Sequence, residues 1–383
     1  MLTVLHRVPV WLPQTETWNH TQISNLPPER VSCHVVCDTT ANLDQFPIAN
    51  LHCLTDDSAA ARLLRRVARK TPLYPWLRNR YGAAVARAAG ARVLHSHFGF
   101  YGWQDLPLAR AAGLGHVVTF YGVDVNKFPR QYPVWRRRYR ELFARVDRVL
   151  CEGRHMADAL VALGCPAGKA RVQHLGVRLD RVPYAPLAWR PGEPLKVLIA
   201  ASFTEKKGIP HAIRALGRIR NDVPLAVTLI GDAADNPDSR AEKRIILRAI
   251  AEAGIAPRLL GFQPHRVMLE EGRRHHVFLS PSIEAKSGDT EGGAPVSLIE
   301  MAATGMMIVS TRHCDIPDVV RDGETGLLAD EGDVDGLTAH LRALIAHPER
   351  WEAMRRAGRA HMEADYDAAV QGERLAAIYA ELA

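Results

Sequence analysis

Short apolar runs alternate along this chain with longer segments rich in alanine, leucine and arginine. The runs lie at residues 93–94, 117–120, 197–200, 226–230, 277–279 and 307–310. Such short continuous runs are typical of strands buried on both faces, and the segments between them have helical spacing. The pattern predicts an α/β protein with parallel sheets covered by helices.

A proline-rich segment divides the chain. Residues 182–194 contain four prolines without helical or strand periodicity, which is typical of a linker. A chain of 383 residues, 47% of them apolar, is too long for one ordinary core, so two domains of roughly 180 residues are expected. We therefore predict an N-terminal domain at 1–181, the linker, a C-terminal domain at 195–360 and a terminal helix at 361–383.

The charge balance favours an anionic partner. The formal net charge is +7, and basic residues cluster with aromatic and leucine residues at 62–80 and at 135–140. Such clusters can lie on an anionic bilayer. The alternative is a solvated arginine-rich helix face with Trp135 and Tyr139 turned to the core. Nucleic acid is disfavoured as a partner because no recognised binding motif accompanies the charge.

Other features of the composition indicate the compartment. No run approaches the ~20 apolar residues of a membrane-spanning helix, and the N-terminus has no signal-peptide core with a cleavage site. The six cysteines are scattered without a C-x-x-C pair or zinc-like histidine spacing, which favours reduced structural thiols. We expect a cytoplasmic protein without a metal site.

The strongest candidate for chemistry is the segment 289–302. Gly292 and Gly293 let the main chain approach a ligand, and a helix follows whose N-terminal amides and dipole favour an anion. Glu291 and Glu300 provide acceptors for hydroxyl groups on either side. This arrangement is suited to a phosphorylated sugar.

Further polar residues follow other apolar runs. Lys207 lies in the turn Ser202-Phe203-Thr204-Glu205-Lys206-Lys207-Gly208, between a strand and a helix, where open α/β sheets bind anions. Gly231 and Gly261-Phe262 follow two more runs. In the first half the candidates are His95, Tyr121, Asp124 and the loop with Thr15 and Glu16. Each also has a structural explanation, such as helix capping by Thr15 or Thr17.

Taken in order, these motifs resemble a retaining glycosyltransferase of family 4. The resemblance covers nearly the whole chain and is strongest at 197–328, from Glu205-Lys206-Lys207-Gly208 to the segment beginning Ile316-Pro317-Asp318. The loop Gln14-Thr15-Glu16-Thr17-Trp18 is similar to that of the branch that assembles bacterial exopolysaccharide. The family implies the GT-B architecture, two Rossmann-like domains facing each other across a cleft, with the terminal helix crossing back to the first domain.

The resemblance also implies roles for individual residues. Glu300 would bind the ribose, Lys207 would neutralise the diphosphate, and Glu291 with the backbone of 293–296 would hold the donor sugar. The leaving phosphate would help to deprotonate the acceptor, without metal or cofactor. The implied catalytic residues are Glu291, Lys207 and Tyr121. The implied donor-binding residues are Ser202, Lys207, Gly231, Phe262, Glu291, Gly292, Gly293, Ala294, Pro295, Val296, Ser297 and Glu300; Thr15, Glu16, His95 and Asp124 are acceptor-side candidates.

Three positions depart from the family pattern. Eight residues separate Glu291 from Glu300, one more than the family has, so either Glu291 or Gly292 occupies the first acidic position; we favour Glu291. Ser202 stands where the family has arginine, and either Lys206 or a distant arginine can compensate. Tyr121 replaces the histidine expected before Gly122.

The predicted partners are a nucleotide-diphosphate sugar such as a UDP- or GDP-hexose, a glycan or lipid-linked acceptor, and an anionic membrane surface at the inner face of the cell membrane. Two alternatives keep the architecture but change the activity: a non-catalytic sugar-nucleotide-binding subunit and a nucleotide-sugar epimerase. A dinucleotide dehydrogenase is disfavoured because no G-x-G-x-x-G follows the first strand.

Overall fold

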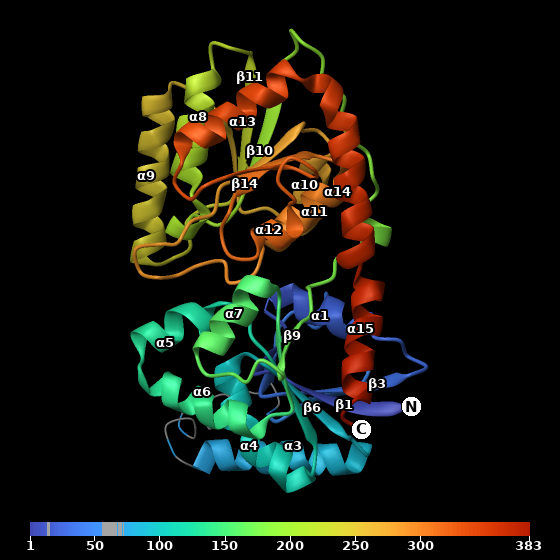
Figure 1. The fold of residues 1–383 in the computed structure, drawn as a ribbon. Coiled ribbons are helices and arrows are strands. Elements are labelled where there is room, and N and C mark those ends of the chain that lie inside the picture. Colours follow the sequence, from blue (N-terminus) through green and yellow to red (C-terminus); the bar gives the residue numbers. More distant parts are fainter. Residues whose placement is uncertain (14–15, 56–66, 68–70, 72) are drawn as a thin grey trace. The chain divides into compact units, whose positions relative to one another are not determined.

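The computed structural model describes residues 1–13, 16–55, 67, 71 and 73–383. The chain forms two compact units (Figure 1). Unit 1 comprises residues 1–176 and 368–383, and unit 2 comprises residues 177–367. The sequence predicts boundaries at 181/182 and 360/361, whereas the two units divide at 176/177 and 367/368. In the structure, residues 182–194 contain no helix or strand.

Unit 1 is built on a seven-stranded sheet whose described pairings are all parallel. Its order is β5-β3-β1-β6-β7-β8-β9. The strands are β1 (Leu2–Arg7), β3 (Val31–Cys37), β5 (Leu51–Cys53), β6 (Val93–His97), β7 (Gly115–Thr119), β8 (Arg148–Cys151) and β9 (Ala170–Val172), beside a small pair of β2 (Val10–Trp11) and β4 (Thr39–Thr40).

Helices cover both faces of the unit 1 sheet. The helices are α1 (Thr17–Ser24), α3 (Leu73–Ala89), α4 (Gly99–Ala112), α5 (Phe128–Gln131), α6 (Val134–Arg145), α7 (Arg154–Ala162) and α15 (Ala368–Ala380), with a π-helical turn at Val123–Lys127. Leu5 and Leu94 pack against α3 and α4, whereas their neighbours Val4 and Val93 pack against Leu375 and Tyr379 of α15. Successive strand residues point to opposite faces, which explains this division.

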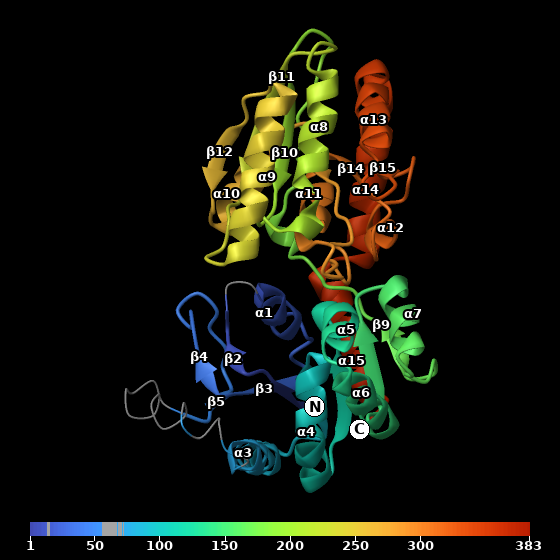
Figure 2. The same ribbon diagram turned by 90° about the vertical axis from the view of Figure 1, so that its left-hand side faces the viewer.

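Unit 2 has a six-stranded parallel sheet, ordered β12-β11-β10-β13-β14-β15 (Figure 2). The strands are β10 (Leu195–Ala200), β11 (Leu225–Ile230), β12 (Arg258–Gly261), β13 (Val277–Ser280), β14 (Met307–Thr311) and β15 (Leu327–Ala329). The helices are α8 (Ile209–Ile219), α9 (Pro237–Ala253), α10 (His265–Gly272), α11 (Val296–Thr304), α12 (Ile316–Val319), α13 (Val334–Ala346) and α14 (Trp351–Asp365).

The core of unit 2 also divides by strand alternation. Val197 and Ile199 face the cluster formed with α8, α9 and α13, whereas Leu198 and Ala200 face the cluster formed with α11 and α14. Every apolar run predicted as a strand lies on one, except that Phe120 follows the end of β7. The expected α/β class with parallel sheets is confirmed.

The two basic clusters of the sequence differ in how much of each the structure describes. Trp135 and Tyr139 are buried in α6, as the arginine-rich helix-face interpretation requires, while Arg136, Arg137 and Arg140 are exposed. Most of the basic stretch 62–70 lies outside the described residues. Among the described helices, none combines the length and the apolar content that crossing a membrane requires.

Candidate active site

The turn after β10 places Lys207 at the carboxyl edge of the unit 2 sheet. Residues Glu205–Lys207 form a single 3-10 turn that ends at Gly208, and α8 begins at the next residue. Gly208 has φ 61°, and a Cβ atom there would lie 1.8 Å from the carbonyl oxygen of Pro281. Only glycine fits this close approach, so the local backbone fixes where the lysine side chain starts.

Lys207 forms a nearly buried ion pair with Glu291. Its Nζ lies 2.8 Å from Oε2 of Glu291, and the side chains are 18% and 6% exposed. The hydroxyl of Ser282 donates to Oε1 of the same carboxylate, at 2.8 Å. Burial raises the pKa of Glu291, but the charges of Lys207 and Lys206 and the two hydrogen bonds outweigh it, so the net pKa is lowered. Glu291 is therefore a carboxylate at neutral pH.

Lys206 holds the loop that carries Glu291. Its Nζ donates to the backbone oxygen of Thr290 at 2.8 Å and lies 3.5 Å from Oδ1 of Asp289. Two adjacent lysines thus contact three consecutive positions of this loop, 289–291. This loop is therefore held by two positive charges.

The loop leads directly into α11, which carries Glu300. The first residue of the helix is Val296, and the residue before it, Pro295, makes no side-chain capping hydrogen bond. Gly292 has φ 80°, which favours glycine. Glu300 is buried, and its Oε1 lies 2.7 Å from Nε2 of His265. That hydrogen bond raises the pKa of His265.

The remaining donor-side candidates lie at the ends of neighbouring strands. Gly231 follows β11 and has φ 125°, and its N–H donates to the oxygen of Gly261 at 2.8 Å. Ser202, just after β10, is exposed. Phe262, just after β12, is 61% exposed, which is unusual for a large aromatic side chain. The carboxyl ends of parallel strands meet at one edge of a sheet, so these residues border the same edge as Lys207.

The acceptor-side candidates belong to unit 1. Asp124 is fully buried and accepts backbone N–H groups from Gly99 at 2.7 Å and Tyr121 at 3.0 Å. Burial raises its pKa to about 6. The hydroxyl of Tyr121 lies 2.6 Å from Nδ1 of His97 and donates to Asn19 at 3.3 Å. Burial raises the pKa of Tyr121.

The N-terminal loop is only partly described. Thr15 lies outside the described residues. Glu16 occupies the N-cap position of α1 without a side-chain capping bond, and burial raises its pKa. Thr17 is the first residue of the helix and not its cap, so capping by Thr17 is wrong.

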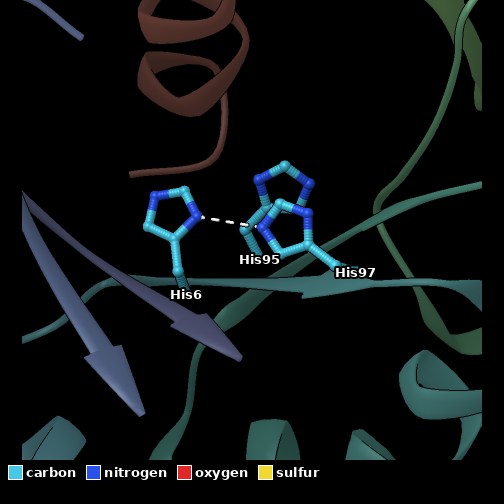
Figure 3. A group of neighbouring side chains, drawn as sticks. All are labelled: His6, His95 and His97. Atoms are coloured by element: carbon cyan, nitrogen blue, oxygen red, sulfur yellow. Dashed lines mark hydrogen bonds between the residues drawn. The ribbon is translucent and has the colours of Figure 1, made fainter. Parts of the chain in front are cut away.

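His95 belongs to a buried cluster with His6 and His97 (Figure 3). In the parallel pairing of β1 and β6, His6 lies opposite His95, and His97 is two residues further on the same face. Nδ1 of His6 lies 3.3 Å from Nε2 of His97. His95 bonds the hydroxyls of Tyr379 and Thr119 through its two ring nitrogens, both at 2.6 Å. Full burial and these bonds favour a packing role for His95.

Among the described residues, these three histidines form a group that could hold a metal ion. Each offers one ring nitrogen, and the three atoms lie within 4.8 Å of one another. Most of these atoms already have partners in hydroxyl groups or in each other. Sequence reasoning missed the cluster because His6 was not singled out. The signal was present in the period-two spacing of His95 and His97, but the partner strand's register was needed to add His6.

Acid should destabilise unit 1 through this cluster. Burial lowers the pKa of His6 and His95 well below 6.5 and that of His97 to about 3. The stability that these neutral rings contribute is complete above the unfolded pKa of 6.5 and is lost as the pH falls toward the folded values. We expect lower protection factors in β1 and β6 at pH 5 than at pH 8, where the protection factor is the intrinsic amide exchange rate at each pH divided by the rate measured by mass spectrometry.

His6→Gln should flatten this pH dependence, whereas His155→Gln, at an exposed position of the same unit, should leave it unchanged. Equal pH dependence in wild type and His6→Gln would contradict the assignment to the cluster.

Comparison with known proteins agrees with these two units. Residues 15–181 match the family model described as Glycosyltransferase Family 4, and residues 189–361 match the one described as Glycosyl transferases group 1. The amylovoran biosynthesis glycosyltransferase AmsK of Erwinia amylovora is 30% identical over 306 residues, 79% of this chain and 73% of the relative. This chain is a family 4 glycosyltransferase.

Other relatives of this glycosyltransferase carry similar names. The putative colanic acid biosynthesis glycosyltransferase WcaL of Escherichia coli is 30% identical over 339 residues, 83% of this chain and 80% of the relative. WcaL of Salmonella typhimurium is 34% identical over 265 residues, 68% of this chain and 63% of the relative.

Solved structures establish the fold of the glycosyltransferase as GT-B. A glycosyltransferase from Rickettsia africae superimposes with a TM-score of 0.79 at 15% identity, covering 100% of this chain and 98% of the other. HepE of Anabaena, in complex with UDP and glucose, superimposes with a TM-score of 0.76 at 15% identity, covering 100% of both chains. Lys207, Glu291 and Glu300 all lie in the segment matched by the group 1 model.

Proposed function

We propose that this glycosyltransferase transfers a hexose from a nucleotide-diphosphate sugar to an acceptor hydroxyl with retention of the anomeric configuration, in the synthesis of exopolysaccharide or another cell-surface glycan. Names of relatives support the biological setting, since AmsK and WcaL are named for amylovoran and colanic acid biosynthesis. The HepE structures, in complex with UDP or UDP-glucose, support a nucleotide sugar as donor.

The observation that carries the proposal is the Lys207–Glu291 pair beside the start of α11. Lys207 and Glu291 are 2.8 Å apart, and the loop from Glu291 continues through two glycines into the helix. The lysine and the first amides of α11 neutralise the diphosphate, as helix N-termini do for anions. Glu291 accepts hydroxyl groups of the donor sugar, and Glu300 accepts those of the ribose.

The reaction then needs positioning and charge stabilisation more than a dedicated base. The diphosphate leaves from the face that the acceptor attacks, and its oxygen takes the acceptor proton. Fixed cationic groups around the leaving phosphate lower the barrier because they need no reorganisation. Neither metal nor cofactor takes part in the proposed reaction.

In unit 1 we propose that Tyr121 contributes its backbone carbonyl rather than its phenol. The phenol is held by His97 and Asn19, and the Tyr121 N–H is held by the carboxylate of Asp124. Asp124 thus shapes the turn. We propose Glu16 and Thr15 as further contributors to acceptor binding. We propose a glycan or a lipid-linked glycan as the acceptor. We also propose that the basic residues within 62–80 and the arginines of 135–140 attract the protein to the inner, anionic membrane face by charge alone, since Trp135 and Tyr139 are buried.

The decisive experiment is a turnover assay of the purified protein with a panel of nucleotide sugars and acceptors, in the presence of EDTA. The proposal expects acceptor-dependent transfer at full rate and a retained anomeric centre. Tight nucleotide binding without turnover would instead indicate a non-catalytic subunit. Conversion of the donor without any acceptor would indicate an epimerase.

Glu300→Ala should weaken donor binding and turnover together. Hydrogen bonds to a charged group contribute about 1.5–3 kcal/mol, so kcat/KM for the donor should fall about 10- to 100-fold. Glu300→Gln, which keeps an acceptor oxygen, should lose less. An unchanged rate in Glu300→Ala excludes the ribose-binding role.

A further inference from the structure

His313 lies behind the loop that carries Glu291. It follows β14, is buried, and its Nε2 accepts the backbone N–H of Glu291 at 3.1 Å. Its other ring nitrogen, Nδ1, lies 2.7 Å from Oε1 of Glu331, which follows β15. The second oxygen of Glu331 accepts the backbone N–H of Glu284 at 2.7 Å. The His313 imidazole and the Glu331 carboxylate thus connect the ends of β14 and β15 with the loop that follows β13, which contains both Glu284 and Glu291.

These contacts select one tautomer of His313. The Glu331 carboxylate only accepts hydrogen bonds, so Nδ1 must carry a proton. The Glu291 amide only donates, so Nε2 must be unprotonated. The thiol of Cys314 also lies 3.2 Å from Nε2. Burial raises the pKa of Cys314 to about 12, so an uncharged thiol lies beside the same nitrogen.

The neighbouring backbone supports a fixed geometry. Cys314 has φ 47°, a left-handed conformation that is uncommon for a residue other than glycine. Hydrogen bonds involving Thr290 and the backbone of Gly292 lower its pKa against the larger effect of burial, so Cys314 touches the loop on both sides of Glu291. The strand-end segment 313–314 therefore holds the backbone of the loop, while Lys207 and Ser282 hold the side chain.

We propose that His313 is a positioning residue for Glu291, with Glu331 fixing its tautomer. The inference rests on the proposed function, because it assigns to His313 the task of aligning the carboxylate that holds the donor sugar. The nucleotide itself is bound by Lys207 and Glu300, which His313 does not contact in the described hydrogen bonds. Losing the imidazole should therefore displace Glu291 and slow the chemical step more than it weakens donor binding.

The tautomer can be tested without any substrate. Imidazole 15N signals of the full-length protein are recorded, and those of His313 are identified by their disappearance in His313→Gln. We expect protonated Nδ1 and unprotonated Nε2 in wild type, and loss of that preference in Glu331→Gln. The opposite tautomer in wild type would overturn the proposal, whether or not the protein transfers sugar.

Two substitutions separate positioning from folding. Gln at position 313 can place an amide oxygen near the position of Nε2 and accept the Glu291 N–H, whereas Asn is too short and reaches only the region of Nδ1. His313→Asn should lower kcat about 100-fold, since small misplacements of a reacting group cost that much, with the donor KM within about threefold. His313→Gln should recover most of the rate.

The matched control is His347→Gln, which removes an exposed histidine paired with Glu349 at 3.1 Å in the same unit. It should leave kcat and KM unchanged. A common loss of melting temperature and rate in both His313 variants would assign His313 a structural role only and overturn the proposal.

A double-mutant cycle links His313 to Glu291. If His313 acts through that carboxylate, His313→Asn should cost less than about threefold in a Glu291→Ala background. Independent, multiplying losses would overturn the proposal. If the wild-type protein shows no acceptor-dependent transfer, the proposed function is wrong. The tautomer of His313 would still be established by the 15N measurement.

Discussion

Replacing Lys207 by methionine should reduce kcat/KM for the nucleotide sugar by about three orders of magnitude, equivalent to about 4 kcal/mol of transition-state stabilisation. Two effects combine. The leaving diphosphate loses the cation that neutralises it, and the buried Glu291 carboxylate loses its partner at 2.8 Å. An unpaired buried carboxylate takes up a proton more readily, so Glu291 would also become a poorer acceptor for sugar hydroxyls.

Lys207→Arg is the conservative variant. It keeps the charge but changes the shape of the donor group, so partial recovery is expected. Steady-state kinetics with saturating acceptor measure all variants, and isothermal titration with the nucleotide alone separates binding from turnover.

The matched control is Lys206→Met, one residue away. Lys206 bonds the backbone of Thr290 and lies beside Asp289, so its loss should loosen the loop and cost clearly less than loss of Lys207. A larger loss for Lys206 than for Lys207 would show that Lys206 compensates for the missing arginine at position 202, and that Lys207 serves mainly to pair with Glu291.

The sequence was sufficient to predict the parts of this site that lie at strand ends. Parallel strands align their carboxyl ends, so motifs far apart in the chain, such as Lys207 and Glu291, are expected at one edge. The structure brings these two side chains into contact. The α/β class followed from the same runs of apolar residues, because strand alternation and helix spacing need no tertiary information.

The parts that sequence could not supply depend on register and on distant contacts. His6 joins His95 only through the pairing of β1 with β6. His313 faces Glu291 only because β14 and β13 are neighbours, which no local pattern at 312–315 reveals. Threonine often caps helices, but Thr17 is the first residue of α1 and Glu16 is at the N-cap. Residue type alone did not show at which residue the helix begins.

A buried charge network in unit 1 escaped sequence reasoning for the same reason. Arg7 is 2% exposed and lies 2.5 Å from Asp38 and 3.9 Å from Asp105, which Arg78 approaches at 3.1 Å. The four charges come from β1, the end of β3, α3 and α4. Burial raises the pKa of Asp105 even though both arginines and a hydrogen bond from Ser96 oppose it.

Arg7→Met should destabilise unit 1 by about 3–5 kcal/mol, because it leaves the carboxylates of Asp38 and Asp105 buried with one partner fewer. Hydrogen exchange measured by mass spectrometry in denaturant reports this loss on peptides of unit 1 separately from those of unit 2. The double variant Arg7→Met with Asp38→Asn should recover part of the stability, since it removes one of the uncompensated charges.

Arg30→Met provides the comparison, because Arg30 pairs with Glu373 at 2.5 Å in the same unit while both side chains are about half exposed. Solvent screens such a pair, so its loss should cost no more than about 1 kcal/mol. Both substitutions remove one arginine charge from an ion pair of 2.5 Å, and the two pairs differ in how deeply they are buried. Equal losses in the free energy of unfolding would mean that burial of the Arg7 ion pairs does not matter for the stability of unit 1. A large loss for Arg7→Met alone would show that these buried ion pairs stabilise the unit.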